Sequence, residues 1–168
     1  LEVLDLNNDN EDAVRILRIN NIVQTEMNLR TKKSVSEYIV MLDELIAESP
    51  DQRSALVLGL GGGLNANLLV EKNYVTEGVE LDKRIIEVAE NYFELNKQVI
   101  SYCEDARYFL NRCEKKYDLV LIDIFKAEEQ PSHILTIESL EQLKANLNPN
   151  ALLYINWHGY VSGEKGAG

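Results

Sequence analysis

Glycines and a glutamate that end two neighbouring apolar runs have the spacing of a nucleotide-binding site. Residues 55–58 are apolar and lead into Gly59, Gly61 and Gly63, and Glu80 ends the next apolar run. Glycines directly after a strand allow the bare backbone to approach a ligand, and an acidic residue about 20 positions later is placed to accept hydrogen bonds from ribose hydroxyls. The spacing predicts a site for a nucleotide-type cofactor.

The position of the third glycine separates two classes of cofactor. The dinucleotide fingerprint G-x-G-x-x-G requires a glycine at the position of Leu64, whereas Gly59, Gly61 and Gly63 form G-x-G-x-G. The second spacing resembles the first motif of class I enzymes that depend on S-adenosylmethionine (SAM). It disfavours a nicotinamide-dependent dehydrogenase. A turn that serves only close packing between a strand and a helix is the structural alternative.

Residues after the second and third predicted strands complete the expected adenosine site. Leu81 follows Glu80 directly, and we include it in the cofactor site. After the third strand, the carboxylate of Asp105 can take an adenine amino group while the backbone at Ala106 meets the ring. A helix N-cap is the alternative for Asp105, and it is the preferred explanation for Asp82.

Asp123 is the candidate catalytic residue because it leaves the fourth predicted strand where the reacting end of the cofactor would lie. A carboxylate there can hold an amine or attract a sulfonium cation. Hydrogen bonds to neighbouring loop amides are the structural alternative. His133 and His158 lie in separate segments without a Ser or Cys at the spacing of a catalytic triad, so we expect surface histidines.

The two cysteines do not indicate a metal or redox site. Nine residues separate Cys103 from Cys113, which is not the C-x-x-C spacing, and no pair of histidines lies nearby. We expect both thiols to be reduced and at least half-buried, and we predict no metal site.

The main part of the chain alternates between strand and helix patterns. We predict strands at 55–59, 75–80, 98–103, 117–123 and 151–157, and helices at 64–72, 83–95, 105–115 and 135–147. Such alternation indicates an α/β fold: a Rossmann-like parallel sheet with helices on both faces. Ligands of these sheets bind at the carboxyl ends of the strands.

The N-terminal residues form a different pattern. Two β-leaning runs flank Asn20-Asn21, which predicts a small N-terminal β-hairpin in residues 1–30. A helix at 34–49 then opens the cofactor-binding domain, residues 31–168. Only 11 residues follow Trp157, so we expect the C-terminal strands of a standard sheet of this type to be missing or to lie outside this chain.

Composition is ordinary for one globular domain. The chain has 168 residues, of which 45% are apolar and 27% charged, and its formal net charge is −11 at pH 7. That charge opposes binding to nucleic acid. Glycines and asparagines interrupt the apolar segment 55–70, so we predict no membrane span, and without a signal peptide a cytoplasmic location is the default. A homodimer is compatible with the sequence.

From the hairpin to the last predicted strand, the chain resembles the spermidine synthase-like branch of the class I SAM-binding superfamily. The matching motifs are Ile19-Asn20-Asn21-Ile22-Val23-Gln24 for L-D-G-x-x-Q, Gly61-Gly62-Gly63 for G-G-G-D-G, Glu80-Leu81-Asp82 for V-E-I-D, Asp105-Ala106 for G-D-[AG] and Asp123 for D-x-x-D. The resemblance implies that Gln24 contacts the cofactor. It implies SAM, decarboxylated SAM or methylthioadenosine as the ligand.

The chain departs from this family pattern where the acceptor amine would bind. Leu64 replaces the Asp of G-G-G-D-G, Lys126 replaces the second Asp of D-x-x-D, and Tyr38-Ile39-Val40-Met41 loses the His and Glu of Y-H-E-M. Carboxylates can hold a diamine and accept its proton, whereas leucine and lysine do neither. The cofactor half of the site is retained and the polyamine half is not.

We therefore expect a SAM-type group transferase resembling a methyltransferase, acting on a small-molecule or protein acceptor that the sequence does not identify. Positioning a reactive sulfonium and excluding water can supply much of the catalysis, so a dedicated base is not required. Two alternatives remain. One is aminopropyl transfer to polyamines with an altered acceptor site, and the other is a non-catalytic domain that binds adenosine-type ligands or mediates dimerisation.

Overall fold

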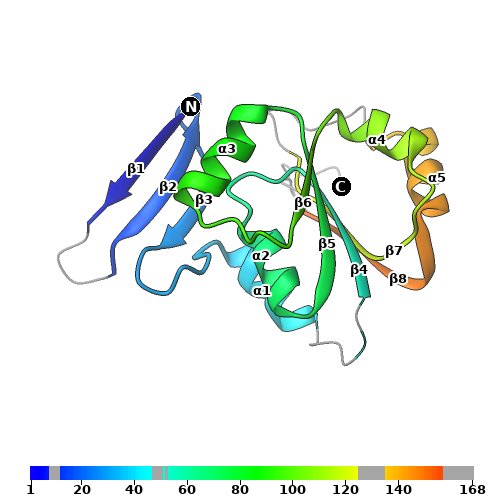
Figure 1. Cartoon of the computed structure of the whole chain (residues 1–168), viewed down its shortest axis with the longest axis horizontal. Helices are drawn as coiled ribbons and strands as arrows, with labels where there is room; N and C mark the ends of the chain where they lie inside the picture. Colours follow the sequence, from blue (N-terminus) through cyan, green and yellow to red (C-terminus); the bar gives the residue numbers. More distant parts are fainter. Residues whose placement is uncertain (8–11, 47–50, 52, 125–134, 157–168) are drawn as a thin grey trace, which may run out of the picture.

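A five-stranded parallel sheet with helices on both faces forms the larger part of the molecule (Figure 1). The computed structural model describes residues 1–7, 12–46, 51, 53–124 and 135–156. Its elements are β1 (Glu2–Leu6), β2 (Val14–Ile19), β3 (Ile22–Asn28), α1 (Glu37–Leu45), β4 (Arg53–Leu58), α2 (Leu64–Glu71), β5 (Tyr74–Glu80), α3 (Lys83–Tyr92), β6 (Ile100–Cys103), α4 (Ala106–Arg112), β7 (Tyr117–Ile122), α5 (Ile137–Ala145) and β8 (Leu147–Ile155). The strand order is β6-β5-β4-β7-β8, which confirms the predicted fold class.

The central strands are buried on both faces. Ala55 and Val57 of β4 belong to one apolar core with residues of α1, α2 and α3, whereas Leu56 and Leu58 belong to a second core with residues of α4 and α5. Figure 1 shows these two groups of helices on opposite sides of the sheet. Side chains of a strand alternate between faces, so a continuous apolar run serves both cores.

The predicted hairpin is present at the N-terminus. Asn20 and Asn21 have φ of 48° and 64°, and Ile19 pairs with Ile22 across the turn. Positive φ at both central residues matches the turn type that follows the right-handed twist of a two-strand ribbon. Asparagine tolerates this conformation better than most other residues, which is why the Asn20-Asn21 pair predicted the turn.

A third strand, β1, joins the hairpin and was not predicted. Glu2 and Asp5 of β1 form ion pairs with Arg18 and Arg15 of β2, each at 2.7 Å. β1 has charges on both faces and most of its residues are exposed, so it lacks the apolar alternation of a half-buried strand. It is a strand because it pairs with β2, whose partner residues lie 8 to 16 positions away in sequence.

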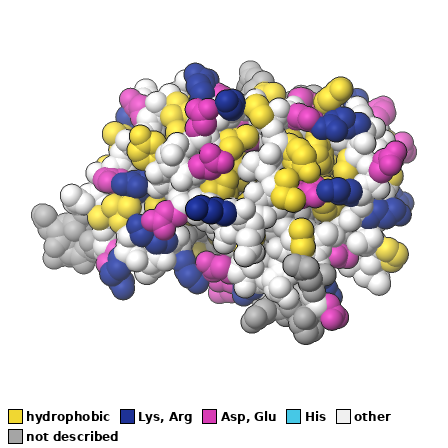
Figure 2. Space-filling model, in the orientation of Figure 1, with side chains coloured by type: hydrophobic (Ala, Val, Ile, Leu, Met, Phe, Trp, Pro, Cys, Tyr) yellow, Lys and Arg dark blue, Asp and Glu magenta, His cyan; other side chains and the backbone are white. Residues whose placement is uncertain are grey.

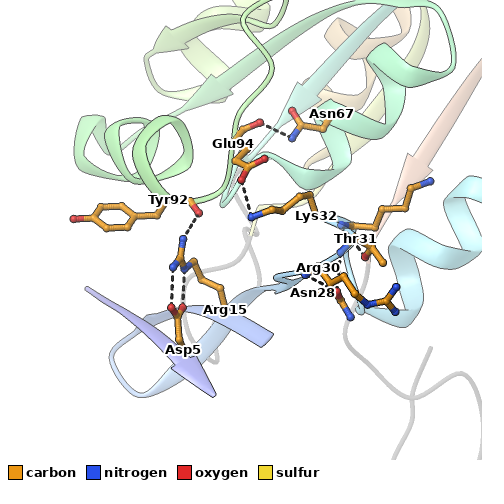
Figure 3. Close-up of polar contacts among 10 residues, drawn as sticks. Asp5, Arg15, Asn28, Arg30, Thr31, Lys32, Asn67, Tyr92 and Glu94 are labelled. Carbon is orange, nitrogen blue, oxygen red and sulfur yellow. Dashed lines mark hydrogen bonds and ion pairs between the residues drawn. The ribbon is translucent and has the colours of Figure 1, made fainter. Parts of the chain in front are cut away.

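Polar contacts connect the N-terminal residues to the end of α3 and the residues that follow it (Figure 3). The guanidinium of Arg15 donates to the backbone oxygen of Tyr92 at the end of α3 (3.0 Å), and Lys32 forms an ion pair with Glu94 (2.8 Å). Leu17 of β2 is fully buried in the same core as α1 and α2. The two sheets therefore share one apolar core, while the division into domains at residue 30 remains a prediction.

Near the C-terminal end of the described chain, two predicted boundaries were wrong. The helix expected to reach residue 147 ends at Ala145, and β8 begins at Leu147 instead of residue 151. The reason is pairing with β7: the backbone N–H of Tyr117 donates to the oxygen of Asn146 (2.8 Å), and the Asn148 amide donates to Asp118 (2.8 Å). These bonds hold the segment in an extended form.

The prediction that both cysteines are at least half-buried was wrong for one of them. Both cysteines are free, and Cys113 is half-buried as expected, but Cys103 is exposed. Cys103 ends β6, which is one of the two edge strands of the sheet. Among the described residues, no further strand pairs with the free side of β6. On the face shown in Figure 2, acidic and basic side chains are interspersed and the basic ones form no continuous area. No helix in the described ranges has the length and apolar character needed to cross a bilayer.

Candidate functional site

A cleft of about 1450 Å³ lies at the carboxyl ends of the central strands. Its walls come from the loop after β4, the ends of β5 and β7, the start of α4, and from β3 and α1. It brings together all the residues predicted for the site: Gln24, Gly59, Gly61, Gly63, Glu80, Leu81, Asp105, Ala106 and Asp123. Their individual roles toward a ligand remain predictions.

Gly59 fixes the beginning of the glycine loop. Its φ is +88°, and a Cβ added to it would lie 2.2 Å from the backbone oxygen of Asp123. The backbone N–H of Asp123 donates to the oxygen of Leu58 (2.8 Å), so the ends of β4 and β7 run side by side at this point. Gly59 therefore allows the Asp123 backbone to approach, a role that the cofactor motif alone did not reveal.

The Glu80 carboxylate lies under the glycine loop. One of its oxygens accepts from the backbone N–H groups of Leu60 (3.2 Å) and Gly61 (3.4 Å), and the other accepts from the N–H of Asp82 (3.1 Å). An ionised carboxylate offers about four acceptor positions, so further donors such as ribose hydroxyls can still be accommodated. These contacts orient the carboxylate at the edge of the cleft.

Replacing Glu80 with alanine is expected to weaken binding of SAM or methylthioadenosine. Loss of hydrogen bonds to a charged acceptor should cost about 1.5–3 kcal/mol, which is roughly one to two decades in affinity. Calorimetric titration measures this, with Glu87→Ala as the control because Glu87 is an exposed glutamate of α3 paired with Lys83 outside the cleft. Unchanged affinity in Glu80→Ala would remove Glu80 from the site.

Asp82 and Asp105 both begin helices. Asp82 accepts from the N–H of Arg84 (2.9 Å), which confirms the predicted N-cap of α3. Asp105 accepts from the N–H of Tyr108 (2.9 Å) through Oδ1, so it caps α4 as the alternative proposed. No residue that the structure describes donates to its second oxygen, which can therefore accept from an adenine amino group. Ala106 is the first residue of α4, where backbone N–H groups lack partners within the helix.

Asp123 accepts hydrogen bonds from α1, from α2 and from the residue that follows β8. Its Oδ2 accepts from the Tyr38 hydroxyl (2.7 Å) and the Asn65 amide (3.1 Å), and its Oδ1 accepts from the Asn156 amide (2.9 Å). Asn65 is 2% exposed. The two asparagines were missed in the sequence, although Asn156 follows a strand end just as Asp123 does. This arrangement fixes the direction of the carboxylate.

Tyr38 supports Asp123 as a neutral donor. Burial raises the pKa of the Tyr38 hydroxyl far above its usual value, and the negative charge of Asp123 and the hydrogen bond to it raise this pKa further. Tyr38 therefore keeps its proton and continues to donate to the carboxylate. The hydroxyl of Tyr154 on β8 donates to the backbone oxygen of Tyr38 (3.2 Å), and the Tyr154 side chain packs against the apolar core behind the site.

The cleft is strongly acidic. Its described lining contains seven carboxylates and no lysine or arginine: Glu26, Glu37, Glu80, Asp82, Glu104, Asp105 and Asp123. Asp82 and Glu104 form ion pairs with Arg84 and Arg112 at the rim. The remaining carboxylates give the cleft a negative potential, which attracts cations.

Several residues singled out in the sequence lie outside the described part of the chain: Lys126, His133, Trp157 and His158. Among the residues that the structure describes, no three His, Cys, Asp or Glu side chains are grouped as metal ligands would be.

Comparison with proteins of known sequence finds methyltransferases and aminopropyltransferases. The chain is 32% identical over 114 residues to the N-terminal histidine N-methyltransferase of Emericella nidulans, covering 65% of this chain and 20% of that protein. It is 30% identical over 132 residues to the polyamine aminopropyltransferase of Vibrio vulnificus, covering 74% of this chain and 44% of that protein. The chain thus spans less than half the length of either relative.

Solved structures share the fold. A probable spermidine synthase from Corynebacterium glutamicum superposes with a TM-score of 0.76 at 18% identity, over 91% of this chain and 59% of that one. Human methyltransferase-like protein 13, solved in complex with S-adenosylhomocysteine (SAH), gives 0.57 at 21% identity, over 66% of this chain and 56% of that one. A model of the spermine/spermidine synthase domain matches residues 32–157. This match covers more than half of the sequence, and the chain accordingly belongs to the spermine/spermidine synthase family.

Proposed function

We propose that the chain binds a SAM-type cofactor and forms the catalytic domain of a methyltransferase. The observation that carries the proposal is the single cleft in which the glycine loop, Glu80, Asp105 and Asp123 meet at the carboxyl ends of parallel strands. In this assignment Glu80 binds the ribose, and Asp105 and Ala106 bind the adenine. Gln24 and Asp123 bind the methionine end.

Leu64 favours SAM over its decarboxylated form. Leu64 is the first residue of α2, is 4% exposed and lines the cleft. It stands at the position of the aspartate in the G-G-G-D-G motif that the resemblance above implies. An aspartate there would repel the α-carboxylate that SAM has and decarboxylated SAM lacks. A leucine removes this repulsion, and the positive end of the α2 dipole favours a carboxylate nearby.

Calorimetric titration with SAM, SAH, decarboxylated SAM and NAD tests the proposal. We expect SAM and SAH to bind at least about tenfold more tightly than decarboxylated SAM, a difference of about 1.4 kcal/mol, and NAD not to bind. Tighter binding of decarboxylated SAM would contradict the choice of cofactor. Failure of every adenosine ligand would contradict the proposal as a whole.

The acceptor that fits this cleft best is a cationic amine. Glu26 and Glu37 line the same cleft as Tyr38, and neither forms an ion pair with a described residue. In this proposal they add negative charge to the part of the cleft that receives the acceptor. Such an amine can belong to a small molecule or to a protein, and the relatives named above include an N-methyltransferase and an aminopropyltransferase. The net charge of −11 argues against nucleic acid as the acceptor. We also propose, from the sequence alone, that the protein is cytoplasmic and forms a homodimer.

Aminopropyl transfer is the second candidate, favoured by the family model and the aminopropyltransferase relatives. We expect the protein not to transfer an aminopropyl group to putrescine at a useful rate, because Ile39 and Leu64 present apolar side chains to the cleft. A diamine must be anchored at one end and aimed at the other, and misplacement by about 1 Å can cost roughly a hundredfold in rate.

Release of methylthioadenosine from decarboxylated SAM and putrescine measures that activity. A known aminopropyltransferase serves as the positive control. We expect Lys126→Asp alone not to create the activity, since residues that act as a unit are not repaired singly. Steady turnover by the wild-type protein would establish aminopropyl transfer instead. Cofactor binding without turnover on a broad panel of amines would indicate the non-catalytic alternative.

A further inference from the structure

Thr25 of β3 contacts the glycine loop from the N-terminal sheet. Its Oγ1 accepts a hydrogen bond of 2.8 Å from the backbone N–H of Gly62, and the bond is buried. The Thr25 residue is 7% exposed. Nothing in the sequence motifs drew attention to this threonine, since the family resemblance points to its neighbour Gln24.

The other amides at the start of this loop are held by the larger sheet or by the loop itself. The N–H groups of Leu60 and Gly61 donate to Glu80, and the N–H of Gly63 donates to the oxygen of Leu60. Gly62 alone among these residues donates to the N-terminal sheet. The middle of the loop is thus attached to a sheet that supplies none of the parallel strands.

Gly62 is a glycine because Thr25 leaves no room for a side chain. A Cβ at Gly62 would lie 2.5 Å from Cγ2 of Thr25 and 3.0 Å from its Cβ and Oγ1. Gly62 is not among the residues that line the cleft, whereas Gly61 and Gly63 are. Position 62 therefore requires a residue without a Cβ because of its contact with Thr25, and not because a ligand would fill that space.

We propose that Thr25 is a positioning residue, which holds the glycine loop in its binding conformation through Gly62 and thereby makes cofactor affinity depend on the N-terminal sheet. This inference rests on the cofactor binding proposed above. Without the hydroxyl, the Gly62 N–H would be buried with no partner, and the loop would have to move to find one. Thr25 itself also lines the cleft. In this proposal it acts on the cofactor through the loop, and the experiments below separate that role from direct contact.

Four variants and one control test this role by titration with SAH. Thr25→Val keeps the shape but places a methyl group 2.8 Å from the Gly62 nitrogen, and we expect affinity to fall about tenfold or more. Thr25→Ser keeps the hydroxyl and should bind within about threefold of wild type. Thr76→Val is the control because Thr76 is also buried, on β5, and among the described residues its hydroxyl donates to the nearby Tyr74 oxygen alone (3.3 Å).

The remaining variants use the packing of Thr25 against Gly62. Gly62→Ala should lose affinity, and Thr25→Ser in the same chain should recover about threefold or more, because it removes the methyl group that the new Cβ meets. No recovery would overturn the steric part of the inference. Equal SAH affinity of Thr25→Val and wild type would overturn the positioning role.

Amide hydrogen exchange at Gly62 supplies a readout that needs no ligand. In the ligand-free protein, Thr25→Val should expose this amide to faster exchange while Thr25→Ser keeps it protected. If Thr25→Val lost SAH affinity with unchanged exchange at Gly62, the hydroxyl would contact the ligand directly and the inference would fail. If wild type bound no SAH, the proposed function would fail, and the exchange at Gly62 would still decide whether Thr25 holds the loop.

Discussion

Gly59→Ala is expected to be the most destabilising substitution at the site. The new Cβ would lie 2.2 Å from the backbone oxygen of Asp123. The backbone fixes the position of a Cβ and the oxygen belongs to the main chain, so no side-chain rotation relieves the clash. The φ of +88° adds strain for any residue with a Cβ. We expect the free energy of unfolding to fall by about 3 kcal/mol or more, from left-handed strain and overpacking together.

Urea unfolding followed by circular dichroism measures this loss, and Gly78→Ala is the matched control. Gly78 lies on the neighbouring strand β5, where a Cβ would meet the flexible end of the Leu60 side chain at 2.8 Å. Leu60 can change rotamer, so the control should lose much less stability. Equal losses for the two variants would show that the close approach of β4 and β7 does not set the cost.

Asp123→Asn is expected to reduce the affinity for SAM much more than the affinity for SAH. SAM carries a positive sulfonium, whereas the sulfur of SAH is neutral, so a nearby carboxylate attracts only the first of these groups. At an effective dielectric constant of about 20, two unit charges 4 Å apart attract each other by about 4 kcal/mol, so a partly hydrated pair should contribute one to two decades in affinity.

Titration of both ligands into Asp123→Asn and Asp118→Asn measures the effect. Asp118 also lies on β7, where it accepts from Ser54 and Asn148 at the opposite end of the strand. This control should leave the ratio of SAM to SAH affinity unchanged. If Asp123→Asn lost affinity equally for both ligands, Asp123 would hold a group that the two share, such as the amine, and would not stabilise the sulfonium.

The sequence by itself determined the fold class, and it predicted a set of site residues that the structure places around one cleft. Apolar runs and helical periods gave the alternation of strands and helices, because these patterns record which side chains face a core. Glu80 and Asp123 could be placed together because both follow strands of a parallel sheet, whose carboxyl ends lie at one edge. The Asn20-Asn21 turn and the Asp82 cap were readable because each depends on neighbouring residues alone.

Only the tertiary structure decided how these residues are held. Thr25 meets Gly62 across 37 positions, and Asn65 meets Asp123 across 58, so no local pattern contains either contact. β1 is a strand because it pairs with β2. Cys103 is exposed because its strand lies at an edge of the sheet. Sequence patterns record the burial and local conformation of each residue. The strand order and the packing of separate elements determine which atoms touch, and these contacts fix the geometry of the site.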